Sequence, residues 1–405
     1  MDRKRILLII AFTILCLLIG FGIYWILFRP IFAPPQQAAP IVTAPAAGLP
    51  AAAPSLPGLP TAAPVAPAAP APTPTSTATG SVTQTISVTN TTAFTPAIAP
   101  DGSSVFFYSP ASGQFSRLTP DGRAVLISDK VFYNVQKVTW APSGQQAILE
   151  YPDQSKILYN FNAKTQVTLP AHWQNFSFSP NSQQIAFLSL GQQEDNRWLA
   201  IANADGSKTQ AIETLGNNAD KVQVAWSPNN QIIAFSRTGE ALGMDSQEIL
   251  FVGKNHENFK SLTANGIGFK AKWSPSGDKI VYSATSGDND WKPQLWVAGA
   301  NVDTVGQNKI SLPVNTWVDK CVFGDETTLY CAVPKNLPRG AGLYQKAAEN
   351  VADDIYKVDL LSGTSSLIAI PDTDFNIDNI LVTTDEKELY FTDRFTGLLH
   401  KINLK

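Results

Sequence analysis

Short apolar runs alternate with polar turns along most of the chain, and this pattern predicts β-strands. From about Ser81 onward, apolar runs of four to seven residues rich in Val, Ile, Phe and Tyr are separated by Gly, Asn, Asp and Ser. Runs of this length bounded by turn residues are typical of strands. The best candidate for a helix is the short stretch GLYQKAAENVADD from Gly342. The pattern therefore predicts an all-β domain over residues 81–405.

One strand–turn–strand segment recurs along this region at a long, nearly fixed period. VTWAPSGQQAILEY begins at Val138, and FSFSPNSQQIAFLS, VAWSPNNQIIAFSR and AKWSPSGDKIVYSA follow it. The turn prolines are Pro100, Pro142, Pro180, Pro228 and Pro275, which lie 42, 38, 48 and 47 residues apart. Asp325 and Asp385 take the same place in two weaker copies. The chain thus holds seven copies of one unit, and such a period marks a repeat architecture.

Each copy follows the same plan of strands and turns. In five copies an aromatic residue stands two positions before the turn proline or its substitute, and these repeat anchors are Trp140, Phe178, Trp226, Trp273 and Phe323. Because the anchors recur at one place, we expect them to pack between neighbouring units. Four antiparallel strands per unit of about 40–50 residues are typical of a β-propeller blade. The sequence therefore predicts a seven-bladed β-propeller.

The closure of the ring can also be predicted. The last copy runs out after its third strand, at LLHKINLK. The stretch QTISVTN from Gln84 precedes the first copy and belongs to none of the seven. We expect the strand near Ile86 to complete the last sheet, which would pair the two ends of the domain and remove an exposed edge. LTPDGR from Leu118 resembles the repeat turn but lies too close to Pro100 for another blade, so it is predicted to be a turn within the first.

The Trp-Ser-Pro turn and the IAF-like strand after it resemble the TolB-type propeller repeat. The same repeat is found in the propellers of prolyl oligopeptidases and dipeptidyl peptidases. The resemblance covers residues 84–405 and implies the propeller fold. TolB has a separate α/β domain before its propeller, and the peptidases place an α/β-hydrolase domain against theirs. In this chain an apolar stretch and a proline-rich segment stand where TolB has its α/β domain, and there is no room for a hydrolase domain. The resemblance therefore implies none of those activities.

An uncharged apolar stretch of 23 residues, Ile6–Phe28, precedes the proline-rich segment. About 20 helical residues span the apolar core of a bilayer, and a cleaved signal peptide has a shorter apolar core. The stretch therefore predicts a single transmembrane helix that stays attached. Residues 3–5 are all basic, whereas only Arg29 is charged between the stretch and Asp101. The positive-inside bias places residues 1–5 in the cytoplasm and the propeller outside it, in the periplasm or at the cell surface.

Residues 29–80 are rich in Pro and Ala and carry no charge after Arg29. Frequent proline fixes φ and removes amide donors, so neither a helix nor a sheet can run through this segment. The expected state is a disordered, partly extended linker. Proline-rich stretches also act as ligands for partner domains, but the position between a membrane helix and a propeller favours a spacer.

The charge of the chain argues against nucleic acid as a partner. The net charge is −3, and residues 1–29 carry +3 because four basic residues there outnumber Asp2. The rest of the chain therefore carries −6. An acidic domain lacks the basic face that phosphate binding requires.

No segment has the spacing of a catalytic or cofactor site. The chain contains neither a Gly-x-Ser-x-Gly elbow nor a Gly-rich phosphate loop between a strand and a helix. The three histidines, His172, His256 and His400, fall in different blades, where we expect exposed loop or strand residues. The sequence therefore predicts no enzyme and no cofactor.

One segment has part of the pattern of a calcium loop. PDTDFNID from Pro371 places oxygen-bearing side chains at alternate positions, namely Asp372, Asp374, Asn376 and Asp378. A calcium loop offers oxygens at positions 1, 3 and 5. However, Ile377 stands where such a loop requires Gly, and no Glu closes it. A polar loop between blades is therefore favoured over a metal site.

Cys321 and Cys331 flank the hairpin CVFGDETTLYC. A turn of three or five residues would bring the two side chains opposite one another, and an extracytoplasmic compartment permits oxidation. A disulfide is one interpretation, and two small buried thiols are the other.

These features together favour a membrane-anchored, non-catalytic propeller that binds a protein, peptide or other ligand, or acts as a scaffold in the cell envelope. Function in such folds lies in surface loops and the central channel. One alternative is a propeller that binds or processes glycans at the channel mouth, where Trp198, Trp291 and Trp317 are the tryptophans to place. Another is the external part of a sensor, which would need a membrane partner because residues 1–5 cannot form a signalling domain.

Overall fold

The computed structural model describes residues 12–13, 17–18, 21, 73–240, 242–257 and 259–405. The chain divides into two units, Met1–Ala69 and Pro70–Lys405, and the second holds all the described strands. The predicted membrane helix and most of the predicted linker lie largely outside the described residues. Among those that are described, no helix combines the length and apolar character needed to cross a bilayer.

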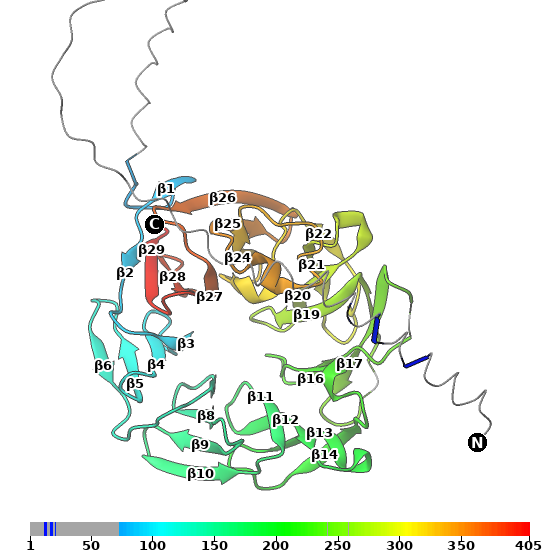
Figure 1. Ribbon diagram of the computed structural model, residues 1–405. Coiled ribbons are helices and arrows are strands. Elements are labelled where there is room, and N and C mark those ends of the chain that lie inside the picture. The colour runs from blue at the N-terminus through cyan, green and yellow to red at the C-terminus, as the bar shows by residue number, and fades with distance from the viewer. Residues whose placement is uncertain (1–11, 14–16, 19–20, 22–72, 241, 258) are drawn as a thin grey trace, which may run out of the picture. The chain divides into compact units, whose positions relative to one another are not determined.

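Seven sheets follow one another in chain order around a ring, which confirms the predicted seven-bladed propeller (Figure 1). Blade 1 contains β3 (Phe94–Ile98), β4 (Val105–Ser109), β5 (Gln114–Leu118) and β6 (Ala124–Leu126). Blade 2 contains β7 (Lys137–Trp140), β8 (Gln146–Glu150), β9 (Lys156–Asn160) and β10 (Thr165–Leu169). Blade 3 contains β11 (Trp173–Phe178), β12 (Gln184–Leu190), β13 (Arg197–Asn203) and β14 (Gln210–Thr214).

The later blades repeat this order, and two of them gain a strand from the start of the domain. Blade 4 contains β15 (Val222–Val224), β16 (Ile232–Ser236), β17 (Ser246–Gly253) and β18 (Leu262–Asn265). Blade 5 contains β19 (Ile267–Trp273), β20 (Lys279–Thr285), β21 (Pro293–Gly299) and β22 (Ile310–Leu312). Blade 6 contains β23 (Cys321–Phe323), β24 (Thr328–Pro334), β25 (Asp353–Asp359), β26 (Thr364–Pro371) and β1 (Ser81–Thr83). Blade 7 contains β27 (Ile377–Val382), β28 (Glu388–Asp393), β29 (Leu399–Asn403) and β2 (Ile86–Ser87).

Two local predictions can be compared directly with these strands. The LTPDGR segment forms the turn between β5 and β6, as the short spacing from Pro100 predicted. The helix considered from Gly342 is reduced to a single 3-10 turn, Gln345–Ala348. Neighbouring blades pack first strand against first strand, for example β3 against β7 and β23 against β27, so the first strands are innermost.

The antiparallel order of the strands sorts the loops into two sets. Loops that join the first strand to the second, and the third to the fourth, lie at one end of the ring, which we call the turn face. Loops that join the second strand to the third, and the fourth to the next blade, lie at the other end, which we call the loop face. The repeated proline turns therefore all belong to the turn face.

Residues 75–88, which we call the closing strap, join blades 6 and 7 along their outer edges. β1 pairs in parallel with β26, where Val82 lies opposite Ile370. β2 pairs antiparallel with β29, where Ile86 lies opposite Lys401. The predicted closing strand is therefore confirmed, and the same strap also binds blade 6, which the repeat pattern did not predict.

Backbone hydrogen bonds extend the closing strap beyond its two short strands. The donor and acceptor pairs are Gly80 N to Ile368 O (2.7 Å), Ala78 N to Asn403 O (2.9 Å) and Val88 N to Leu399 O (2.9 Å). The ring therefore takes up residues ahead of Ser81, which the sequence assigned to the linker.

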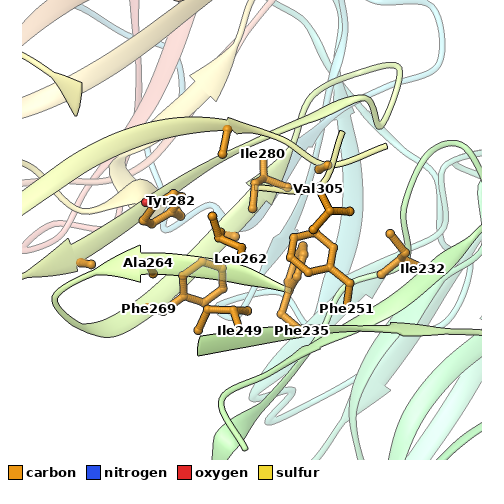
Figure 2. Close-up of a cluster of buried hydrophobic side chains, with 14 residues drawn as sticks. Ile232, Phe235, Ile249, Phe251, Leu262, Ala264, Phe269, Ile280, Tyr282 and Val305 are labelled. Carbon is orange, nitrogen blue, oxygen red and sulfur yellow. The ribbon is translucent and has the colours of Figure 1, made fainter. Parts of the chain in front are cut away.

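Each of the seven seams between blades has its own cluster of buried apolar side chains. The cluster between blades 4 and 5 is shown in Figure 2, where Phe235 and Phe251 of blade 4 lie near Ile280 and Tyr282 of blade 5. Every one of these four side chains is at least 97% buried. Burial on this scale stabilises the fold by roughly 25 cal/mol per Å² of apolar surface removed from water. The propeller is thus held together mainly across its seams.

The structure places the repeat anchors in these seams. Trp140 stacks on Phe106 of blade 1 with ring centroids 5.2 Å apart, and its Nε1 donates a hydrogen bond to the Thr95 carbonyl at 2.9 Å. Trp273 contacts blade 4 in the same way. Phe178, Trp226 and Phe323 each pack with side chains of the preceding blade.

Hydrogen bonds also join neighbouring proline turns on the turn face. The amide of Ser143 donates to the Ser182 hydroxyl at 2.9 Å, and the amide of Thr384 donates to the Gly102 carbonyl at 2.8 Å. Gly102 has φ 74°, and a Cβ there would collide with the Thr384 side chain, so only glycine fits. These turns of the turn face therefore stabilise the contacts between neighbouring blades.

His400 of β29 is buried, which corrects the expectation of an exposed histidine. Its ring lies 4.6 Å from that of Phe375 and 5.4 Å from that of Phe391, measured between centroids. Its Nε2 has no hydrogen-bond partner among the described residues. Burial lowers the pKa of His400, although the carboxylates of Asp393 and Asp372 oppose the shift.

We expect the stability of the propeller to fall as the pH drops from 7.5 to 5.5, in part because of His400. The unfolded chain takes up a proton on this residue near its ordinary pKa of about 6.5, and the folded chain resists it, so acid favours unfolding. Thermal melts should show a shallower decline over this pH range for His400→Phe. His172→Gln, at an exposed position, should keep the full decline. Equal slopes for His400→Phe and the unmodified chain would refute this assignment.

Candidate functional site

The loop face carries the longest loops of the propeller. The loop 335–352 joins β24 to β25, the loop 127–136 joins β6 to β7, and the loop 237–245 joins β16 to β17. The turn face has no described loop as long as 335–352. Because binding residues are concentrated on loops that a rigid scaffold positions, the loop face is the first place to look for a site.

Large apolar side chains are exposed on the loop face far more often than on the turn face. On the loop face they are Val131, Tyr133, Leu242, Met244, Leu343, Tyr344 and Phe395, which are between 43% and 67% exposed. Among the described loops of the turn face, only Leu361 belongs to this class. We call the seven residues the apolar tips. These residues were not identified from the sequence. Their position as apolar residues inside predicted loop segments was the signal that could have indicated them.

The loop 335–352 lies across the loop between β20 and β21. The amide of Gly340 donates to the Asp290 carbonyl at 2.9 Å, and that of Gly342 donates to the Trp291 carbonyl at 2.8 Å. Gly342 also lies so close to Thr285 that an added Cβ would collide with its hydroxyl. The two loops of blades 5 and 6 therefore form one connected platform.

Asp290 and Trp291 both adopt left-handed backbone conformations, with φ of 52° and 56°. Such conformations cost about 1–3 kcal/mol for residues other than glycine, and they concentrate at functional sites. Here the bonds from Gly340 and Gly342 hold the strained pair in place. The strain fixes the direction in which the chain continues into Lys292 and β21.

Buried contacts support the platform from below. Trp317, Ala341 and Ala348 form a small cluster, with Trp317 only 6% exposed. The side-chain amide of Asn376 donates to the backbone carbonyls of Ala348, Glu349 and Val351. The loop 335–352 is therefore attached to blades 5, 6 and 7.

A buried ion pair lies under the same region. The Lys320 ammonium contacts both carboxylate oxygens of Asp353, at 3.0 and 2.7 Å, and the amide of Ile377 donates to Asp353 at 2.7 Å. Burial raises the pKa of Asp353, and Lys320 opposes that shift. Because both charges are paired and further hydrogen-bonded, the pair serves to join blade 6 to blade 7 and is not free for chemistry.

Polar side chains on the inner strands are also used within the ring. Lys272 of β19 donates to the carbonyls of Asp319 at 3.1 Å and Cys321 at 2.8 Å. Lys270 forms an ion pair with the Asp319 carboxylate at 2.9 Å. Burial lowers the pKa of Lys272. These groups tie blade 5 to blade 6, so both lysines of β19 are engaged within the ring.

The alternating oxygens of the calcium-like segment do not converge. Asp372 accepts from the amide of Thr85, Asp374 pairs with Lys335, Asn376 supports the platform, and Asp378 is exposed on β27. Over residues 73–405 with their two single-residue gaps, no group of three or more His, Cys, Asp or Glu could hold a metal ion.

Cys321 and Cys331 lie directly opposite one another in β23 and β24. They form a disulfide with sulfurs 2.13 Å and Cα atoms 4.1 Å apart, and both residues are fully buried. The bridge lies inside the seam between blades 5 and 6, so its role is structural.

The three histidines do not come together. His172 and His256 are exposed and His400 is buried, and each belongs to a different blade. None of them bonds to both a serine hydroxyl and a carboxylate in the part of the chain that the structure describes. The tryptophans of the glycan alternative are also dispersed, since Trp317 is buried under the platform while Trp198 and Trp291 are half-buried.

Comparison with known proteins supports the fold alone. No protein-family model and no curated protein matches the chain. An oligogalacturonate lyase solved in complex with manganese is similar over 79% of this chain and 93% of its own, with a TM-score of 0.57 and 12% identity. The β-propeller domain of Cps50 (Swd1) from Myceliophteria thermophila covers 79% of this chain and all of its own, with a TM-score of 0.52 and 11% identity.

A third similar structure is the hydrazine synthase of Kuenenia stuttgartiensis, which covers 78% of this chain and 96% of its own at 12% identity and a TM-score of 0.52. Two of these names denote enzymes, a lyase and a synthase, and the third denotes a propeller domain. At 11–12% identity the similarity shows the fold alone, and the resemblance to the TolB-type repeat stays a prediction. What the structure shows for this chain is an all-β, seven-bladed propeller with several exposed apolar side chains in the loops of its loop face.

Proposed function

We propose that the chain is a non-catalytic binding module that docks a protein partner on its loop face. The stretch Ile6–Phe28 anchors it in a membrane, residues 29–72 act as the spacer, and the propeller lies outside the cytoplasm. The observation that carries the proposal is the uneven distribution of exposed apolar side chains, with seven on the loop face and one on the turn face.

The chemistry of the apolar tips fits a protein surface. Tyr, Phe and Met are enriched at the centres of protein interfaces, where they are removed from water against a partner. The tips come from four loops, and polar residues separate them. They therefore form several contact points rather than one continuous apolar patch. A protein partner with matching pockets can engage such points together.

The rigidity of the platform also favours binding. Leu343 and Tyr344 follow a turn in which both amides donate to the Gly340 carbonyl. Since the loop is already attached to three blades, little conformational entropy would be lost when it meets a partner. Apolar side chains held in place at such positions can be removed from water by a partner without further ordering of the loop.

Site-specific photocrosslinking in intact cells tests this function. A photoreactive phenylalanine analogue at Tyr344 should give a defined protein adduct. The double variant Leu343→Ser, Phe395→Ser should weaken partner binding roughly a thousandfold and abolish the adduct, since each side chain lost from an interface centre costs about 2 kcal/mol. Protease added outside the cells should trim the adduct to the size of the propeller plus its partner.

The matched control places the same analogue at Leu361, which is 67% exposed on the turn face. It should give no defined adduct. An adduct from Leu361 and none from Tyr344 would place the partner on the other face. Protection of the adduct until the cells are lysed would reverse the proposed orientation.

A further inference from the structure

A cavity of about 520 Å³ opens on the loop face at the seam between blades 5 and 6. Lys292 enters it from the loop before β21, and Asn315 from the loop after β22. Asn336, Asp354 and Tyr356 enter it from blade 6. A volume in this range is typical of sites for small molecules.

The polar groups of this cavity are available to a ligand. Within the described chain, the Lys292 ammonium, the Asn336 amide and the Tyr356 hydroxyl make no hydrogen bond or ion pair to protein. Asp354 Oδ1 is buried without a hydrogen-bond partner, and its only cation, Lys335, is 3.8 Å away. Buried polar atoms normally have a hydrogen-bond partner, so a carboxylate oxygen at a cavity that has only a long ion pair can accept a hydrogen bond from a bound ligand.

The cavity is also preorganised. The strained pair Asp290 and Trp291 directly precedes Lys292 and is held by the loop 335–352. Asn315 is oriented by Asn289, whose side-chain amide donates to it at 2.9 Å. Backbone strain that the surrounding structure maintains is a feature of ligand sites.

The charges at the cavity balance. Lys292 and Lys335 are cationic, Asp354 is anionic, and Asp374 pairs with Lys335 at 2.8 Å. A strongly anionic or cationic ligand would therefore meet as many repulsive as attractive charges. Apolar side chains form the remaining wall, including Pro313, Val314 and Leu337. The site is thus amphipathic and close to electrically neutral.

We infer that this cavity binds an uncharged saccharide unit. A pyranose ring presents several hydroxyls along its edge and C–H groups on its faces, which match the polar groups and the apolar wall of the cavity. The hydroxyls can donate to Asp354 and accept from Lys292, and others can bond to the amides and the phenol. A zwitterion such as an amino acid has only two charged ends and would leave most of these groups unused. This inference is independent of the docking of a protein on the apolar tips.

Ligand-observed saturation-transfer NMR tests the inference on the full chain, kept in a detergent without a sugar headgroup. The probes are three neutral disaccharides, namely cellobiose, lactose and N,N′-diacetylchitobiose. Galacturonate, an anion, and glycine, a zwitterion, are the charged comparison ligands. At least one neutral disaccharide should bind saturably, and the charged probes should not displace it. Lys292→Met and Asp354→Asn should each weaken binding about tenfold, the loss expected for one hydrogen bond to a charged group.

The control variant is Asp288→Asn, an exposed change on the same loop as Lys292 that lies outside the cavity. It should leave binding unchanged. Lys292 has no ion-pair partner among the described residues, so Lys292→Met should keep the melting temperature and separate lost binding from lost folding. Binding by galacturonate or glycine alone, absence of saturable binding by all three disaccharides, or equal weakening by Asp288→Asn would each overturn the inference.

Discussion

Deletion of residues 81–87 is expected to lower the stability of the whole propeller by about 5 kcal/mol or more. The deletion removes β1 and β2, so it exposes the edges of β26 and β29 and opens the ring at blade 7. Each backbone hydrogen bond contributes about 1 kcal/mol, and the total stability of a domain is only about 5–15 kcal/mol. The variant should therefore melt at a much lower temperature or aggregate through its exposed edges. Circular dichroism and urea titration measure this loss.

A control deletion and a peptide rescue show whether the loss of stability comes from the closing strap. Deletion of residues 35–69 should leave the melting temperature unchanged, because the compact unit begins at Pro70. A synthetic peptide of residues 73–90 added to the strap deletion should restore much of the lost stability by pairing with the open edges. An unchanged melting temperature in the strap deletion would mean that the ring closes without the strap.

Replacement of Trp273 by alanine is expected to cost about 3–5 kcal/mol, as is typical of large aromatic side chains removed from a core. Its ring stacks on Phe235 at 4.9 Å and meets Phe251 edge-on at 6.2 Å, both in the preceding blade. Its Nε1 also donates to the Ala225 carbonyl at 3.0 Å. The loss therefore falls on the seam between blades 4 and 5, and urea unfolding followed by circular dichroism measures it.

Two further variants separate the components of this loss. Trp273→Phe keeps an aromatic ring in the seam but removes the donor, so it should cost only about 1 kcal/mol beyond any repacking. Trp198→Ala removes a tryptophan that is half-buried on β13, outside the anchor position, and should cost much less than Trp273→Ala. Equal losses at Trp198 and Trp273 would show that the repeated position has no special role in packing.

The sequence by itself determined the architecture, because each blade of a propeller repeats the same local pattern of strands and turns. Proline turns and alternating strands are local signals, and their period fixed the number of blades and the anchor positions. The closing strand could be found by counting, since the last copy lacked one strand and the segment near Ile86 was left over. The buried state of His400 could not be found in this way, because burial depends on Phe375 and Phe391, which are distant along the chain.

The tertiary structure alone decided where a site can lie. Trp317 and Trp291 look alike in sequence, yet one is buried under the loop 335–352 and the other supplies a carbonyl to Gly342. The apolar tips are far apart along the chain and share a face only because alternate loops of a propeller emerge at the same end. The cavity beside Lys292 is formed by loops of two blades that no periodic pattern describes. Loops do not repeat, so their contacts follow from the packing of the whole ring, whereas the strands that carry them follow from hydrophobic periodicity and turn chemistry.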